Sequence, residues 1–158
     1  MTTPHGPWLS DDEQRVWRSY LQVTGMLTEH LDRELRRDAE IPHTYYQVLA
    51  MLSEAPGRSL RMTELAAAAW ASTSRMSHAV DRLAEAGWVE RQPAPDDKRG
   101  QIAVLTDAGY QKLTKAAPGH SAAVRAILFD PLSPQLLAAF GEICSSALGQ
   151  LGANCDQP

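Results

Sequence analysis

The stretch "SRMSHAVDRLAEAGWVERQPAPDDKRGQIAVLTDAG", from Ser74 to Gly109, changes from a helical to a β-type hydrophobic pattern. Gly87 lies between the two parts, where helices commonly end. Two short β-like runs, "WVERQ" and "QIAVLT", then flank a loop with two prolines, two acids, two bases and a glycine. The stretch therefore predicts a helix followed by a β-hairpin. The apolar positions that define the inward face of the helix are Met76, Ala79, Val80 and Leu83.

Two shorter helices are predicted just before this stretch. The segment "YYQVLAML" reads as an apolar helix that stops at the breaker cluster "EAPGRS". The segment "MTELAAAAW" reads as an alanine-rich helix, with Thr63 placed to cap it. A turn at "AST" then leads into the next helix. Two short helices joined by a tight turn and followed by a hairpin have the layout of a winged helix-turn-helix.

Longer helices are predicted on both sides of this unit. The first runs from Asp11 to Asp38. After the hairpin, Asp107 is placed to cap a helix that is interrupted near Pro118 and Gly119. A last helix spans Leu132 to Leu151. The predicted fold class is mainly α with a small β-hairpin wing, in the order α-α-α-α-β-β-α-α.

The composition sets broad limits. With 158 residues, the chain is long enough for one domain with a real core, and too short to favour two independent domains. Its formal net charge of −4 counts mildly against nucleic acid as a partner, because DNA binding neutralises phosphates. A local basic stripe on an acidic protein overcomes that objection. Neither a secretory signal nor a membrane span is expected, and the two cysteines, Cys144 and Cys155, suggest no disulfide framework or metal site. A reducing cytoplasm fits best.

The helix from Ser74 and the hairpin tip carry residue types suited to DNA. Small hydroxyls near the start of the helix allow close approach to a groove, and Arg75 is long enough for a bidentate contact with guanine. Lys98 and Arg99, with Gly100 beside them, are predicted at the tip of a protruding hairpin, placed to enter the adjoining minor groove. The candidate DNA-binding residues are Ser72, Thr73, Ser74, Arg75, Ser77, His78, Arg82, Lys98 and Arg99.

Acidic residues in the same hairpin need a separate explanation, because they would repel phosphates if they faced DNA. Asp96, Asp97 and Arg91 are interpreted as braces of the wing. Asp97 is expected to pair with Arg99, with Arg82 or with Arg91. The alternative is a solvated turn of mixed charge, with no binding role.

The motifs of this region resemble the MarR family of bacterial transcriptional regulators. The family pattern stands here as "DRL", "GWVER", "DKRG" and "LTDAG", in the segment from Asp81 to Gly109. The resemblance implies an obligate homodimer with interlocked terminal helices that binds a pseudo-palindromic DNA operator and responds to a small aromatic or phenolic effector. It implies no cofactor and no metal. Candidate effector contacts are Trp17, His43, Tyr45 and Tyr46.

The domain organisation follows from the layout and the resemblance together. Residues 11–38 and 120–152 are expected to form a helical dimerisation region, and residues 42–118 the winged helix-turn-helix, in a single intertwined domain. Apolar stripes on the terminal helices, wider than a small wing domain could cover, support this independently. The first helix has no cysteine, so a redox sensor of the kind found in some relatives is not expected.

Two other classes of function are alternatives to a DNA-binding repressor. An enzyme is disfavoured because the histidines are scattered and stand in no HExxH, CxxC or glycine-rich phosphate-loop setting. The second alternative is a winged-helix protein–protein module without DNA binding. The net charge of −4 favours that module, whereas the retained Arg75, Arg82, Lys98 and Arg99 argue against it. The operator, the effector and the regulated genes do not follow from the sequence.

Overall fold

The computed structural model describes residues 8–94 and 97–155 of the chain, with only the backbone at residues 98, 99 and 153–155. The chain divides into two compact units, one ending at His120 and the other beginning at Ser121. Among the described residues, no helix is both long enough and apolar enough to cross a membrane. In chain order, the elements are α1 (Asp11–Asp38), α2 (His43–Glu54), η1 (Pro56–Arg58), β1 (Ser59–Arg61), α3 (Met62–Ala68), α4 (Thr73–Glu85), β2 (Val89–Ala94), β3 (Asp97–Leu105), α5 (Asp107–Val124), η2 (Arg125–Phe129) and α6 (Pro134–Cys155).

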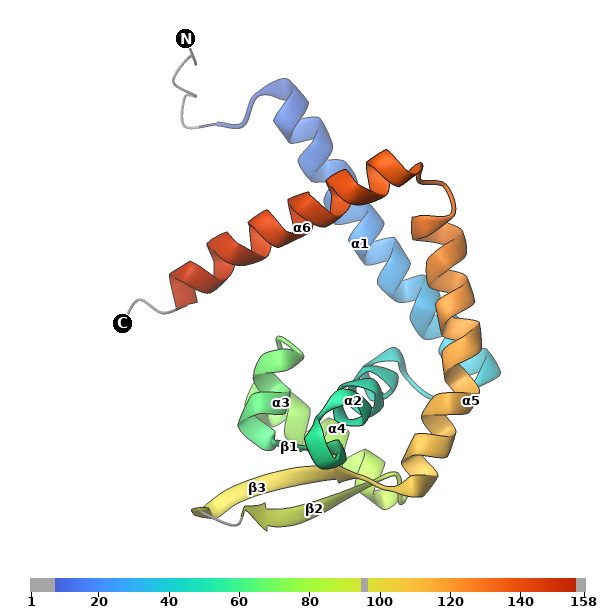
Figure 1. Cartoon of the computed structure of the whole chain (residues 1–158), viewed down its shortest axis with the longest axis vertical. Coiled ribbons are helices and arrows are strands. Elements are labelled where there is room, and N and C mark those ends of the chain that lie inside the picture. The colour runs from blue at the N-terminus through green and yellow to red at the C-terminus, as the bar shows by residue number, and fades with distance from the viewer. Residues whose placement is uncertain (1–7, 95–96, 156–158) are drawn as a thin grey trace. The chain divides into compact units, whose positions relative to one another are not determined.

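The predicted fold class is confirmed: the chain is mainly helical, and β2 and β3 form a long antiparallel hairpin beside α4 (Figure 1). The hairpin belongs to a three-stranded sheet in the order β1-β3-β2. The third strand, β1, was not predicted, because it has only three residues and begins at Ser59, the last residue of the breaker cluster. Its residues Ser59 and Arg61 pair with Val104 and Ile102 of β3.

The paired strands of the wing are longer than predicted. Both strands extend into the expected loop, so that Ala94 of β2 already pairs with Asp97 of β3, and only residues 95 and 96 connect them. Pro93 pairs with Gln101, so residues 98–100 bulge from β3 opposite no residue of β2. The long loop of the prediction is thus a short connection followed by a bulge.

The core of the first unit lies where α2, α3 and α4 pack on the sheet. Leu49, Leu65 and Leu83 from these helices have no exposed surface. The C-terminal end of α1 contributes Leu35, and the start of α5 contributes Leu113. Burying side chains of this size stabilises the fold by roughly 1.5–3 kcal/mol each, so α4 rests on a well-packed base.

Three local predictions about helix starts and breaks were wrong. The N-cap of α3 is Arg61, whose N–H donates to the Glu64 carboxylate at 3.1 Å, and Thr63 lies inside the helix. The hydroxyl of Thr106, rather than the side chain of Asp107, caps α5 by accepting from the Gly109 N–H at 3.0 Å. Pro118 does not interrupt α5.

The continuity of α5 has a simple reason. A proline removes the hydrogen bond to the carbonyl four residues earlier, which here belongs to Thr114. Both Pro118 and Thr114 are exposed, so water can hydrate that carbonyl. The irregularity falls later, in the π-helical turn η2, where the Asp130 N–H donates to the Arg125 carbonyl at 2.8 Å.

Candidate nucleic-acid interface

The inward face of α4 is the one that the sequence predicts. Met76, Ala79, Val80 and Leu83 are all buried. Ser72 is the N-cap, and its hydroxyl accepts from the Arg75 N–H at 3.3 Å. This fixes the outward face, so that the start of the helix presents small hydroxyls and long polar side chains to solvent. The exposed candidates are Ser72, Thr73, Ser74, Arg75, His78 and Arg82.

Both acids on α4 are occupied in ion pairs. Glu85 pairs with Arg82 at 2.8 Å, and Asp81 pairs with Arg91 of β2 at 2.9 Å. Within the described part of the chain, Arg75 forms no ion pair. The outer face of the first turns of α4 therefore carries an uncompensated positive charge, although the helix as a whole has as many acids as arginines.

Arg91 braces the recognition helix against the wing. Besides Asp81, its Nη2 donates to the Ser77 carbonyl at 3.0 Å and to the Ser77 hydroxyl at 2.8 Å. The predicted bracing role of Arg91 thus has a geometric basis, with partners on α4 that the sequence did not suggest. Ser77 is half-buried and turned toward Arg91, unlike the other candidate hydroxyls, so it belongs to the brace.

The bulge of β3 is shaped by Asp97 and Gly100. A Cβ added at Gly100 would lie 2.9 Å from Asp97 Oδ2 and 3.0 Å from Ala94 Cβ. The carboxylate therefore folds over the glycine, and a larger residue would push it away. Arg82 and Arg91, both proposed as partners of Asp97, form ion pairs with Glu85 and Asp81. Asp96 and the side chains of Lys98 and Arg99 lie outside the described residues.

A second glycine, Gly109, allows the backbone to pack closely at the base of the wing. A Cβ at Gly109 would lie 2.1 Å from the Trp88 carbonyl oxygen. That oxygen accepts from the Thr106 N–H at 3.1 Å, and the Thr106 hydroxyl donates to the Gly87 carbonyl at 2.8 Å. Gly87 itself has φ +73°, the left-handed conformation typical of a residue just after a helix. The end of α4, the base of the wing and the start of α5 are therefore held in one junction.

The four candidate effector residues do not form one cluster. His43 and Tyr46 lie together on α2, and the ring of His120 from α5 is 5.4 Å from the former and 4.2 Å from the latter, between ring centroids. Tyr45 packs half-buried against the core. Trp17 stacks on Tyr20, 5.8 Å between centroids.

Trp17 lies far from the histidine pair in the same subunit. Asp32 of α1 accepts from the His43 N–H at 2.8 Å, and so marks the place where α1 meets α2. At 1.5 Å of rise per residue, Trp17 is about 22 Å farther along α1. Within one chain, therefore, Trp17 does not join His43 and Tyr46 in a common pocket.

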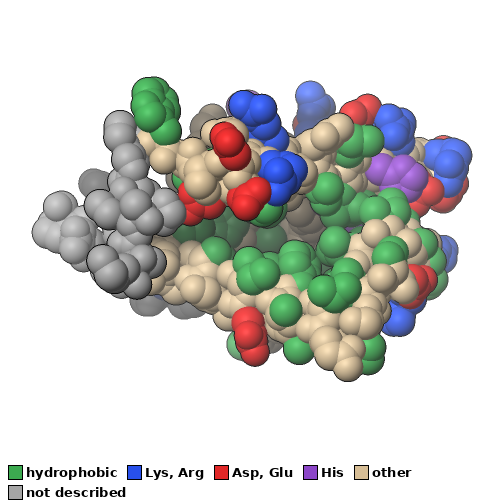
Figure 2. All heavy atoms as spheres, turned by 90° about the horizontal axis from the view of Figure 1, so that it is seen from above, with side chains coloured by type: hydrophobic (Ala, Val, Ile, Leu, Met, Phe, Trp, Pro, Cys, Tyr) green, Lys and Arg blue, Asp and Glu red, His purple; other side chains and the backbone are tan. Residues whose placement is uncertain are grey.

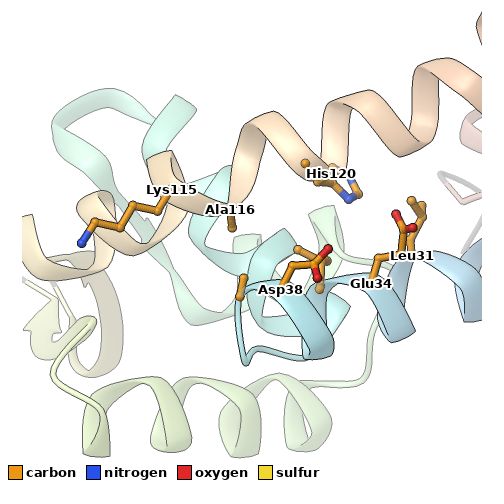
Figure 3. A pocket seen from close by; sticks show the side chains of 9 residues that line it. Leu31, Glu34, Asp38, Lys115, Ala116 and His120 are labelled. Carbon is orange, nitrogen blue, oxygen red and sulfur yellow. The ribbon is translucent and has the colours of Figure 1, made fainter.

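A cavity of about 60 Å³ lies beside His120, between α1 and α5. The carboxylates of Glu34 and Asp38 point from α1 toward α5, and the imidazole of His120 points back toward α1 (Figure 3). The Nδ1 atom of His120 is buried without a hydrogen-bond partner in the described structure. No group of three or more His, Cys, Asp or Glu side chains that could hold a metal is found among the described residues.

Comparison with known proteins identifies the family. A model described as "MarR family" matches residues 40–100. The crystal structure of Sco3205, a MarR family transcriptional regulator from Streptomyces coelicolor in complex with DNA, is 51% identical and superposes with a TM-score of 0.87, covering 96% of this chain and 95% of that one. The chain belongs to the MarR family of transcriptional regulators. It is accordingly a regulator and not an enzyme.

Two further relatives agree with this assignment. AbsC, a MarR family regulator from S. coelicolor, is 36% identical with a TM-score of 0.87, over 94% of this chain and 99% of that one. The transcriptional repressor MprA from Escherichia coli (strain K12) is 26% identical over 101 residues, or 64% of this chain. That match spans 57% of MprA, just over half the length of this curated relative.

Sequence reasoning missed His120 as a neighbour of His43 in this MarR-family chain. The two histidines are far apart in sequence, and nothing in the pattern of α5 singles out His120. Burial lowers the pKa of His43, an effect that the Asp32 carboxylate partly offsets. Burial also lowers the pKa of His120, and the nearby His43 lowers it further. Both rings therefore favour the neutral form.

This pair predicts a loss of stability in mild acid. The folded-state pKa of both histidines lies below the ordinary value of 6.5, so the unfolded chain binds more protons as pH falls past that value. The free energy of unfolding should decrease as pH falls from 6.5 toward the lowered pKa values, and level off below them. Urea unfolding across this range measures the slope. His120→Gln should flatten it, and a slope equal to that of the wild type in this variant would contradict the assignment.

Proposed function

We propose that this MarR-family protein is a ligand-responsive transcriptional repressor that binds a pseudo-palindromic DNA operator as a homodimer. The observation that carries the proposal is the exposed start of α4, where Arg75 forms no ion pair with any described residue and lies beside the small side chains of Thr73 and Ser74. Arginine in this setting suits the O6 and N7 acceptors of guanine in a major groove. Such a target would place the protein in the cytoplasm, on the nucleoid.

The wing supplies the second proposed contact. Lys98 and Arg99 stand in the bulge of β3, at the end of the hairpin that Arg91 fastens to α4. Arginine is attracted to the negative potential of a narrow minor groove. Helix and wing would thus read adjoining grooves, with their relative position set by the Arg91 brace. Sco3205, which is 51% identical to this chain, was solved in complex with DNA.

Exposed apolar side chains on the terminal helices support the homodimer. Monomers rarely expose large contiguous apolar surfaces, so side chains of this kind indicate a protein interface. Figure 2 shows hydrophobic side chains exposed at the surface. On α1 the exposed set is Val16, Trp17, Tyr20, Leu21, Val23 and Met26, and on α6 it is Leu136, Leu137, Ile143, Leu148 and Leu151. Residues 11–38 and 120–152 are accordingly proposed as the dimerisation region around the winged unit of residues 42–118.

The effector site is proposed at the junction of α1, α2 and α5. His43 and Tyr46 lie there with His120, next to the cavity lined by Glu34 and Asp38. An aromatic or phenolic ligand that separated these helices would shift the recognition helix, which packs on α2, and lower the affinity for the operator. Tyr45 and Trp17 remain candidate contacts of the same effector, the latter only if the partner subunit supplies it.

Selection of bound sites from random-sequence duplex DNA tests this function. The expected result is an inverted repeat whose half-sites lie about one helical turn, roughly 34 Å, apart. Arg75→Ala should relax the preference at one position of each half-site, with a loss of about 1–3 kcal/mol in discrimination. Arg33→Ala, which removes an exposed arginine paired with Glu29 on α1, is the matched control and should leave the selected sequence unchanged. A pool without an enriched sequence would refute the operator, and an unaltered site with Arg75→Ala would refute the role of Arg75.

A further inference from the structure

The side chain of Trp70, in the turn between α3 and α4, is not packed into the fold. Its side chain is 74% exposed, and its backbone stands at φ +50°. This left-handed conformation suits glycine or asparagine and is unfavourable for a bulky aromatic residue. The turn itself is fixed by main-chain bonds, from the Trp70 N–H to the Ala67 carbonyl at 3.1 Å and from the Ala71 N–H to the Ala66 carbonyl at 3.0 Å. Neither the backbone nor packing therefore explains a tryptophan at this position.

The indole borders a groove beside the start of the recognition helix. This groove has a volume of about 180 Å³ and lies between the first turn of α2 and the turn before α4. Its polar rim consists of Thr44, Gln47 and Arg75, all of them exposed, and its floor is apolar. Of the described residues that line the groove, Arg75 carries the only charge. The rim thus combines a hydroxyl, an amide, a guanidinium and the indole N–H, and it has no carboxylate.

Such a rim complements an anionic chain with apolar segments. The sugar–phosphate backbone of DNA alternates between the two, and most protein–DNA hydrogen bonds go to phosphate or sugar, from neutral side chains as well as cationic ones. We propose that Trp70, with Thr44 and Gln47, forms a contact site for the backbone of the duplex next to the recognition helix. The indole face packs on a deoxyribose and its N–H donates to a phosphate. This inference rests on the proposed DNA-binding function, because the same duplex fills the groove and meets Arg75.

Replacing Trp70 by glycine separates binding from stability. Trp70→Gly removes the indole and relieves the left-handed backbone, so the melting temperature should equal or exceed that of the wild type. Affinity for a mixed-sequence duplex, measured by fluorescence anisotropy, should fall about tenfold, and equally for a selected site, because backbone contacts carry no sequence information. The slope of log affinity against log salt should stay unchanged, since a neutral indole releases no counterion. Gln47→Ala, on an exposed helix position, should weaken binding in the same sequence-independent way.

Trp8→Gly is the matched control, because this indole is 83% exposed and lies before α1. It should leave DNA affinity unaltered. Wild-type affinity in both Trp70→Gly and Gln47→Ala would overturn the contact site while leaving the DNA-binding function intact. A weaker dimer in sedimentation of Trp70→Gly would also overturn it, since a second copy of the chain would then occupy the groove. Failure of the wild type to bind any duplex would overturn both proposals.

Discussion

Replacing Gly109 by alanine should lower the free energy of unfolding by about 2–4 kcal/mol. The new Cβ would lie 2.1 Å from the Trp88 carbonyl oxygen and 2.8 Å from Leu105 Cδ1. The first of these atoms belongs to the backbone, so no side-chain rotation can relieve the clash. The oxygen is also held in place by the Thr106 N–H. The start of α5 would have to move away from the base of the wing, breaking the bond from the Gly109 N–H to the Thr106 hydroxyl.

Gly119, on the same helix, is the matched control. A Cβ added there would meet no atom of the described residues within 4 Å. Gly119→Ala should therefore stabilise the protein by roughly 0.5–1 kcal/mol, the usual gain from alanine inside a helix. Urea unfolding followed by tryptophan fluorescence measures both variants, since Trp88 lies half-buried at the junction. Equal stabilities would show that the contact between Gly109 and Trp88 does not constrain the fold.

Close contacts at Gly100 and Gly109 give a physical reason for two of the motifs that resemble the MarR family. Gly100 leaves room for the Asp97 carboxylate, and Gly109 for the Trp88 carbonyl. Both stand in the motifs on which the resemblance rests, "DKRG" and "LTDAG". A motif of this kind records close approaches to a glycine, by side chains at Gly100 and by a backbone carbonyl at Gly109, but only coordinates reveal which atoms approach. The motifs therefore indicate the family, and the coordinates supply the physical reason for its glycines.

Predictions based on periodic hydrophobic patterns were the most successful. The inward stripe of α4 depends on burial of one helix face, and its spacing is visible in the sequence. Features that depend on contacts between distant segments were not predicted from the sequence. Ser77 accepts from Arg91 across α4 and β2, and His43 meets His120 only after α5 folds back on α2. The strand β1 is too short for any alternation, and only its pairing with β3 defines it.

DNA binding by this protein should be unusually salt-sensitive for a chain with a net charge of −4. Affinity depends on where the charges lie, and several acids of α1 are paired within their own helix, Glu29 with Arg33 at 2.7 Å and Asp32 with Arg36 at 2.6 Å. The acids of α4 are paired as well. Those pairs leave the proposed DNA-facing cations to act on phosphates. They are Arg75, Lys98 and Arg99 of both subunits, whereas Arg82 is itself paired with Glu85.

A protein that contacts roughly 6–10 phosphates loses about 10³–10⁵ in affinity between about 50 and 200 mM salt. For this protein, titrations of a labelled duplex should show an affinity loss of at least about 10³ over that salt range. Arg99→Ala should reduce the slope of log affinity against log salt by about 1 for each subunit that loses a phosphate contact, without changing the melting temperature. Arg33→Ala should keep the wild-type slope, because that arginine is paired on α1. A wild-type affinity that hardly changes with salt would favour the winged-helix protein–protein module over a DNA-binding repressor. An unchanged slope in Arg99→Ala alone would remove only the wing from the interface, because the recognition helix presents its own cation at Arg75.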